Sequence, residues 1–233
     1  MPVTACEFES HLAHSFLFLF TLNLFCMWEV NPEETGRAKA FDSWMKAVVP
    51  MVTIFKTLDV SRLVRLSKKN HLKFNMLMCF CVVRAASRVE EFYMLPIDGK
   101  LMRFDKLAVS VVVNTKAGGI TTCDVPFIDD IRKFNSAYLE LTQKVYESGE
   151  EYCLDNECMV VGTSALVKHE LDGMVNIYAG FFNNPFLAWA KYRKCLFKVK
   201  LPVSFQFHHT QMDGGHAAAF LDILQEEIAG LKV

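Results

Sequence analysis

The chain has 233 residues, of which 52% are hydrophobic and 22% are charged, and its formal net charge is −1. This length fits one well-buried domain or at most two small ones, and the composition is that of a globular chain rather than a disordered one. A net charge so close to zero argues against binding of nucleic acid or anionic membranes by bulk charge.

The eight cysteines do not form a recognisable framework. The absence of any Cys-x-x-Cys pair excludes the usual zinc-ribbon and thioredoxin motifs. Cys79 and Cys81 fall within an apolar helical run, and the other cysteines show no paired spacing. We therefore expect reduced, buried thiols in a cytoplasmic protein.

An apolar run near the N-terminus, Ser15–Met27, is too short to span a bilayer. It lacks a basic leader and a small-residue cleavage site, so it does not match a signal peptide. Two interpretations stand: a first strand over Phe16–Glu29, or non-native sequence ahead of a true start at Met27. We treat residues 1–26 as an N-terminal extension, non-native or poorly ordered, and residues 27–233 as one domain.

Apolar periodicity and turn signals predict alternating helices and strands in the first half of the domain. Pro32–Thr35 is typical of a helix start and precedes the helix expected over Arg37–Ala47. Helices are expected over Arg37–Ala47, Val60–Lys69 and Leu72–Phe92, and strands over Met51–Leu58, Tyr93–Ile97 and Leu101–Asp105. Asp98-Gly99 is a typical hairpin turn between the last two strands.

The second half is richer in strands. Strands are expected over Leu107–Asn114, Ile120–Phe127, Met159–Leu166, Val175–Ala179 and Val203–Phe207, and helices over Pro126–Ser148 and Ala217–Leu224. Asn183-Asn184-Pro185 turns the chain into Phe186–Lys191, and a basic cluster over Arg193–Lys200 precedes the final strand. The pattern predicts an α+β domain with a mixed, mostly antiparallel sheet.

The final strand is followed by His208 and His209, then Asp213 and two glycines, then an apolar helix. Three interpretations compete for this stretch. A metal site is disfavoured because adjacent residues on a strand point to opposite faces, so the two histidines should not share an ion. A structural role suits Asp213, since an aspartate before two glycines and a helix is typical of a cap. A general base suits His209, because histidine exchanges protons near neutral pH.

The stretch His208–Gly214 has the pattern His-His-x-x-x-Asp-Gly and resembles the motif of the chloramphenicol acetyltransferases and related CoA-dependent acyltransferases. Further resemblance lies in Leu201–His209, which is similar to the family's final strand, and in Ser164-Ala165-Leu166 and Ala190-Lys191-Tyr192. Lys69–Phe74 with the helix after it, and Asp98–Leu101, also follow the family pattern. The similarity extends from about Glu33 to the C-terminus.

The resemblance implies a two-layer sandwich with helices on one side of the sheet, and an acyltransferase domain over residues 27–233. His209 would be the general base that removes a proton from an acceptor hydroxyl, and Ser164 would donate to the oxyanion. Asp213 would hold the turn, and Tyr192 would lie near the coenzyme. Acetyl-CoA would be a co-substrate, with no permanently bound cofactor and no metal.

The same resemblance implies the partners. The acceptor would be chloramphenicol or a similar small-molecule alcohol, in a cytoplasmic antibiotic-resistance enzyme with no nucleic-acid or membrane partner. A chain of this length supplies one lobe, so the family's homotrimer with interfacial active sites is expected. The alternative is a non-catalytic or scaffolding member of the same fold.

Some positions depart from the family pattern. Ala188 stands where many members have a threonine, and Gly214-Gly215-His216 differs from the usual Gly-Phe-His. The segment between Ser164 and Tyr192 is two residues shorter than in familiar members. The N-terminal Trp-x-Arg, whose arginine pairs with the motif aspartate, is not intact, which leaves Arg37 as the candidate partner of Asp213. These departures leave the acceptor open.

Overall fold

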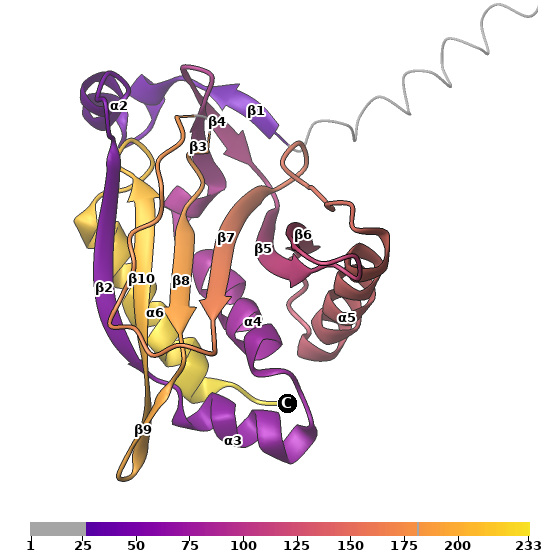
Figure 1. The fold of residues 1–233 in the computed structure, drawn as a ribbon. Helices are drawn as coiled ribbons and strands as arrows, with labels where there is room; N and C mark the ends of the chain where they lie inside the picture. Colours follow the sequence, from indigo (N-terminus) through magenta and orange to yellow (C-terminus); the bar gives the residue numbers. More distant parts are fainter. Residues whose placement is uncertain (1–26, 181) are drawn as a thin grey trace, which may run out of the picture.

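A seven-stranded sheet is the framework of the computed structural model, which describes residues 27–180 and 182–233 (Figure 1). Its strands are β2 (Met51–Asp59), β5 (Leu107–Asn114), β6 (Ile120–Pro126), β7 (Met159–Leu166), β8 (Phe186–Ala190), β9 (Arg193–Cys195) and β10 (Lys198–His208). The spatial order is β2-β10-β8-β7-β5-β6, and β9 pairs with the start of β10. The β8–β7 and β7–β5 pairs are parallel and the others antiparallel, so the predicted mixed, mostly antiparallel sheet is confirmed.

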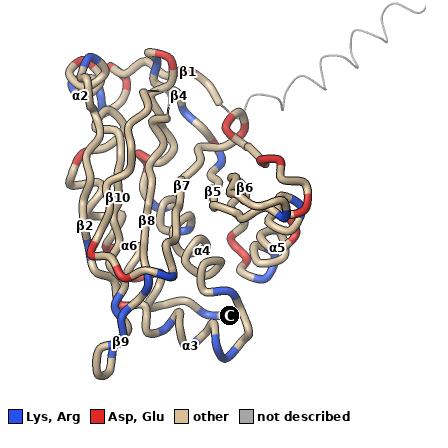
Figure 2. Tube along the Cα trace, viewed as in Figure 1, with Lys and Arg blue, Asp and Glu red and all other residues tan. Residues whose placement is uncertain are grey.

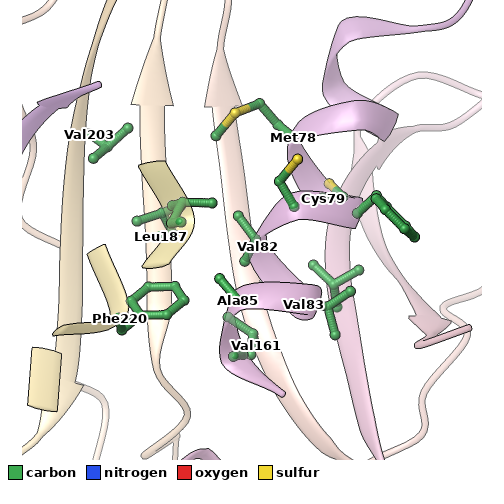
Figure 3. Packing of buried hydrophobic residues seen from close by; sticks show 14 of the residues in the cluster. Met78, Cys79, Val82, Val83, Ala85, Val161, Leu187, Val203 and Phe220 are labelled. Atoms are coloured by element: carbon green, nitrogen blue, oxygen red, sulfur yellow. The ribbon is translucent and has the colours of Figure 1, made fainter. Parts of the chain in front are cut away.

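Four helices cover one face of this sheet (Figure 1). They are α3 (Ser61–Asn70), α4 (Phe74–Ala86), α5 (Ile131–Ser148) and α6 (Gly214–Gly230). Nearly every residue of α4 is buried, which suits a helix that is apolar on all sides. Figure 3 shows Val82 and Ala85 of α4 facing the strands that carry Val161 and Leu187. Each of the buried valine and leucine side chains contributes about 1.5–3 kcal/mol.

A second, three-stranded sheet lies at the end of the molecule where β10 finishes (Figure 1). Its strands run in the order β1-β4-β3, with β1 at Met27–Val30, β3 at Met94–Ile97 and β4 at Lys100–Phe104. A short 3-10 turn at Pro32–Glu34 and the helix α2 (Ala38–Trp44) connect β1 to β2. These elements bring the N-terminal part of the described chain next to the last turn of β10.

On the other face of the large sheet the described residues form no helix, and residues 167–180, called the strap below, cross it (Figure 1). The backbone N–H of Met174 donates to Oγ of Ser204 at 2.9 Å, which anchors the strap on β10. At Gly173 the strap approaches so closely that an added Cβ would lie 2.5 Å from the Phe55 ring. The absence of a side chain at this position therefore permits the contact.

The sequence prediction of a strand over Val175–Ala179 is wrong, because these residues belong to the strap and pair with no strand. The β-branched composition favoured a strand, but both edges of the neighbouring β8 are occupied, by β7 and β10. Val175 and Ile177 are 68% and 80% exposed. Tertiary context has thus overridden local propensity.

Two predicted helices are shorter in the structure. The helix expected over Leu72–Phe92 ends at Ala86, where the hydroxyl of Ser87 donates to the carbonyl of Arg84 and competes with continued helical bonding. A 3-10 turn, Glu90–Tyr93, follows. The helix expected to begin at Pro32 is interrupted, since the 3-10 turn there ends at Glu34 and α2 begins at Ala38.

The predicted strand over Phe16–Glu29 and the extension over residues 1–26 lie outside the described residues, except that Met27–Val30 forms β1. No helix in the described part of the chain is long and apolar enough to cross a bilayer. Of the six described cysteines, four are buried and two, Cys153 and Cys195, are exposed, and all are free thiols. The expectation of buried thiols therefore holds for most of them.

Candidate active site

His209 follows the last residue of β10 and has a backbone that is held on both sides. Its N–H donates to the carbonyl of Pro50 at 2.8 Å, and its carbonyl accepts from Nη2 of Arg37 at 2.7 Å. The side chain is half-buried. The strand end therefore presents this imidazole from a rigid backbone.

The indole of Trp44 lies flat against the imidazole of His209, with ring centroids 4.5 Å apart and an interplanar angle of 7°. Nδ1 of His209 is buried and has no hydrogen-bond partner among the described residues. One face of the imidazole is thus covered and its plane is fixed, and with Nδ1 buried, Nε2 is the ring nitrogen left to meet a second molecule.

His208 is placed differently from its neighbour. Only 2% of it is exposed, and its Nδ1 accepts a hydrogen bond from the N–H of Thr210 at 3.1 Å. Burial, together with the nearby charge of His209, lowers the pKa of His208 from 6.5 to about 4. His208 is therefore neutral near pH 7 and a poor proton acceptor there.

The residues best placed to hold a metal ion lie outside the His208–Asp213 stretch. Among the described residues, the group whose ligand atoms converge closely enough to hold an ion is Asp124, Cys153 and Asp155. It includes neither histidine of the motif. The interpretation of the His-His-Asp stretch as a metal site gains no support from this geometry.

Asp213 caps the helix that follows the motif. Its Oδ1 accepts from the N–H groups of Gly215 at 2.9 Å and His216 at 3.3 Å, and Nδ1 of His216 accepts from the N–H of Asp213 at 3.4 Å. Burial opposes ionisation, but these hydrogen bonds and the charges of His216 and Arg37 hold the pKa of Asp213 below its usual 3.8. The carboxylate is committed to the turn, which fits the structural role predicted for it.

Arg37, the candidate partner of Asp213, lies within hydrogen-bonding distance of it, with Nη1 at 3.3 Å from Oδ2. The guanidinium is buried and also donates from Nε to the carbonyl of Thr210 at 3.0 Å, in addition to its bond to His209. One side chain therefore binds the turn from His209 to Asp213 at three points. The planar fork of arginine suits such a site better than lysine would.

Ser164 lies in the middle of the sheet rather than at its end. It is opposite Ala188 of β8, which is itself opposite Ser204 of β10. His209 is five residues beyond Ser204, so the strand rise of about 3.3 Å and the strand spacing of about 4.8 Å put Ser164 roughly 19 Å from His209. A single chain does not bring the two residues together.

Tyr192 lies toward the end of the sheet opposite to His209, in a cleft of about 1360 Å³. The cleft is bordered by the ring of Phe74, whose centroid is 5.4 Å from that of Tyr192. Four cations and one acid also line it: Lys73, Lys191, Arg193, Lys194 and Glu170. The charge of this lining suits a phosphorylated ligand.

Trp44 is the residue of this site that the sequence did not indicate. Its spacing with Phe41 and Met45 is typical of the apolar stripe of a helix, here the one expected over Arg37–Ala47, and no motif connects it to a histidine 165 positions later. The contact arises because β2 pairs with Lys200–His208 of β10, so that the start of β2, and α2 just before it, lie at the end of β10. Arg37 was found through the family resemblance alone.

A family model described as chloramphenicol acetyltransferase matches residues 26–225. The chain belongs to the chloramphenicol acetyltransferase family. Among curated proteins it is similar to chloramphenicol acetyltransferase 2 of Escherichia coli, with 28% identity over 179 residues that cover 72% of this chain and 81% of that one. It is also 23% identical to the chloramphenicol acetyltransferase of Clostridium perfringens, over 86% of this chain and 97% of that one.

Among solved structures, a chloramphenicol acetyltransferase superimposes with a TM-score of 0.77 at 18% identity, covering 86% of this chain and 98% of that one. A dihydrolipoamide acetyltransferase of Azotobacter vinelandii superimposes with a TM-score of 0.63 at 19% identity, covering 83% and 86%. These likenesses confirm the predicted fold. The family and the names of the curated relatives identify the chain as an acyltransferase.

Proposed function

We propose that this acyltransferase moves an acetyl group from acetyl-CoA to a hydroxyl of chloramphenicol or a similar small alcohol, with His209 as general base. The observation that carries the proposal is the partly buried imidazole of His209, fixed at a strand end by Pro50, Arg37 and Trp44. A base held this way is positioned before substrate arrives.

In this mechanism His209 takes the proton of the acceptor hydroxyl as its oxygen attacks the thioester carbonyl carbon. The resulting tetrahedral oxyanion accepts a hydrogen bond from the hydroxyl of Ser164. When the intermediate collapses, the carbon–sulfur bond breaks and His209 returns the proton to the leaving thiolate. General-base assistance supplies about 10²–10⁴-fold, and one oxyanion donor about 2.7–4 kcal/mol.

The choice between the two histidines follows from their surroundings. His208 is buried, already accepts a backbone hydrogen bond, and has its pKa lowered to about 4. A group with that pKa is a weak base near pH 7 and is poorly suited to take the proton of the acceptor hydroxyl and hold it until the thiolate leaves. His209 is less buried, and its Nε2, unlike its Nδ1, is not among the buried unbonded atoms, so His209 acting through Nε2 is the better candidate.

The cleft beside Tyr192 is the proposed site for CoA. Phosphate groups of the coenzyme would lie against Lys73, Lys191 and Lys194, and the rings of Phe74 and Tyr192 would border the rest of the molecule. Acetyl-CoA enters and leaves as a co-substrate in each turnover.

A complete site needs more than one copy of the chain, because Ser164 and Tyr192 lie far from His209 along the sheet. We infer a homotrimer in which His209 of one subunit faces Ser164 of the next. Exposed apolar side chains on the open face of the sheet and on the strap support such an interface: Phe55, Leu166, Val167, Val175 and Ile177.

The test is an assay of thiol release from acetyl-CoA, run with chloramphenicol and with a panel of small alcohols. We expect release that depends on the acceptor, and a loss of about 10²–10⁴-fold in His209→Gln with an unchanged melting temperature. His71→Asn is the matched control, since His71 is exposed and its left-handed φ of 54° is one that asparagine tolerates. A trimer that releases no thiol with any acceptor would favour the scaffolding alternative.

A further inference from the structure

The hairpin between β9 and β10 ends in two large apolar side chains that face solvent. Register pairs Cys195 with Lys198, so Leu196 and Phe197 form the turn between them. Leu196 is 102% exposed and Phe197 is 96% exposed. Single exposed apolar residues are ordinary, but two adjacent ones at a tip that no other described residue covers indicate an interaction surface.

The tip extends beyond the rest of the sheet, below the helices in the view of Figure 1. Its shape is convex, with every residue from Lys194 to Lys198 exposed. A convex tip cannot bury itself in a flat protein surface without a matching pocket. It can enter a soft, deformable surface.

Cations outnumber acids around the tip, where Glu170 and Asp172 lie against Arg193. Lys194, Lys198 and Lys200 lie within the hairpin, and the chain contains no acidic residue between Asp172 and Asp213. Within the described residues Lys194 forms no ion pair, and Lys198 reaches Asp59 only at 3.8 Å. Lysine and arginine near an anionic surface each favour binding, and their long stems allow the charged ends to reach headgroups.

Helix α3 adds further cations at the same end of the molecule (Figure 2). Its N-terminus is tied to β10, since Oγ of Ser61 accepts from the N–H of Val199 at 2.8 Å. Arg65, Lys68 and Lys69 on this helix are exposed, and no acidic residue occurs between Asp59 and Glu90. The net charge of −1 for the whole chain therefore conceals a basic end.

We propose that the tip, Lys194–Lys198, docks the protein on a membrane surface that contains anionic lipids. Leu196 and Phe197 enter the boundary between headgroups and acyl chains, and the cations of the hairpin and α3 lie against lipid phosphates and carboxylates. Nucleic acid would use the cations and leave the two apolar side chains in water. This inference shares Lys194 with the cleft proposed for CoA, but Leu196 and Phe197, which carry it, do not line that cleft. It departs from the absence of a membrane partner that net charge suggests.

The experiment is co-sedimentation of the full-length chain with vesicles of phosphatidylcholine, with and without phosphatidylserine, at low and high salt. We expect binding to the vesicles with phosphatidylserine, weakened by salt. Leu196→Ser combined with Phe197→Ser should lower the bound fraction at least about tenfold, because the tip then has no apolar group to bury. Lys198→Gln should weaken binding at low salt and matter less at high salt.

Ile120→Ser is the matched control, since Ile120 is 71% exposed at the start of β6, away from the tip, and its loss should not change binding. The apolar run Ser15–Met27 is present in every variant, so its own contribution is constant. Equal binding by the tip variant and the parent would overturn the proposal. Two other results would also overturn it. Absence of vesicle binding together with self-association that the tip variant loses would assign the tip to a contact with a second copy. Absence of vesicle binding together with a raised KM for acetyl-CoA in the tip variant would assign the tip to the cleft.

Discussion

The imidazole of His209 depends for its orientation on neighbours that take no part in proton transfer. Its backbone is bonded to Pro50 and Arg37, and its ring rests on the indole of Trp44. Motif spacing identifies such a histidine and the capping aspartate after it. It does not identify Trp44, which comes from helix α2 far away in the sequence, because a sequence pattern carries no information about ring stacking.

Trp44→Leu should lower kcat about tenfold or more while KM for acetyl-CoA stays unchanged. Without the indole, the imidazole can rotate away from the angle at which it meets the acceptor hydroxyl. Trp44→Phe should recover most of the rate, because a phenyl ring restores a flat partner. Trp28→Leu, at a 43% exposed tryptophan on β1, is the control. A rate that is the same in both leucine variants would show that the stacking has no role in orientation.

His208 makes a separate prediction about stability and pH. Its pKa in the folded chain is lowered to about 4, whereas the ordinary value is 6.5. Between these values the unfolded chain binds a proton that the folded chain does not, so stability is full above pH 6.5 and is lost as pH falls toward 4. The maximal effect is about 3 kcal/mol.

His208→Gln should therefore flatten the part of the stability curve that lies between pH 4 and pH 6.5. Urea midpoints of parent and variant at pH 7 and pH 5 provide the measurement, and the difference between the two chains isolates this group from the titrating carboxylates. The parent should lose more stability than the variant on acidification. Parallel curves would mean that folding does not lower the pKa of His208.

At the scale of elements, local sequence predicted a strand correctly where a neighbouring strand in the sheet had an unpaired edge. The strands β5 and β7 have the predicted bounds, since each is apolar and ends at a polar or turn residue. The strap has a strand-like composition over Val175–Ala179, yet its neighbours on the sheet were already paired. The outcome there depended on the topology of the sheet, which residue patterns do not specify.

Gly162 on β7 offers a test of how tightly β7 and β8 pack beside Ser164. A Cβ at this position would lie 2.9 Å from Cε2 of the Phe186 ring and closer still to Cδ2. Gly162→Ala should therefore destabilise the fold by about 1–3 kcal/mol. Gly36→Ala, where no atom lies within 4 Å of the added Cβ, should change the urea midpoint little. Equal midpoints for the two variants would show that the Phe186 ring moves aside without cost.

At the scale of the whole molecule, the residues predicted for one site divide into two groups. His209, Asp213 and Arg37 lie at the end of β10, whereas Ser164 and Tyr192 lie toward the other end of the sheet. The sequence identified members of both groups through motifs. Their separation depends on strand register, because Ser164 is level with Ser204 of β10 and His209 is five residues beyond Ser204.

That separation predicts complementation between two inactive variants. His209→Ala and Ser164→Ala should each lose activity when assembled alone, because every interfacial site lacks one of the two groups. If the variants are unfolded together and refolded as a mixture, a mixed trimer contains one interface that joins an intact His209 to an intact Ser164. Thiol release from acetyl-CoA should then return to a fraction of the parent rate, up to one site in three.

The recovered rate of thiol release also shows whether His209 and Ser164 of one site come from different subunits. Mixing the folded variants without refolding is the control, and it should give no recovery if trimers do not exchange subunits. Activity that never returns in refolded mixtures of proven mixed composition would mean that both groups act within one chain. The register of β7, β8 and β10 argues against that result, because it holds the two side chains roughly 19 Å apart across paired strands that cannot slide without breaking their ladder.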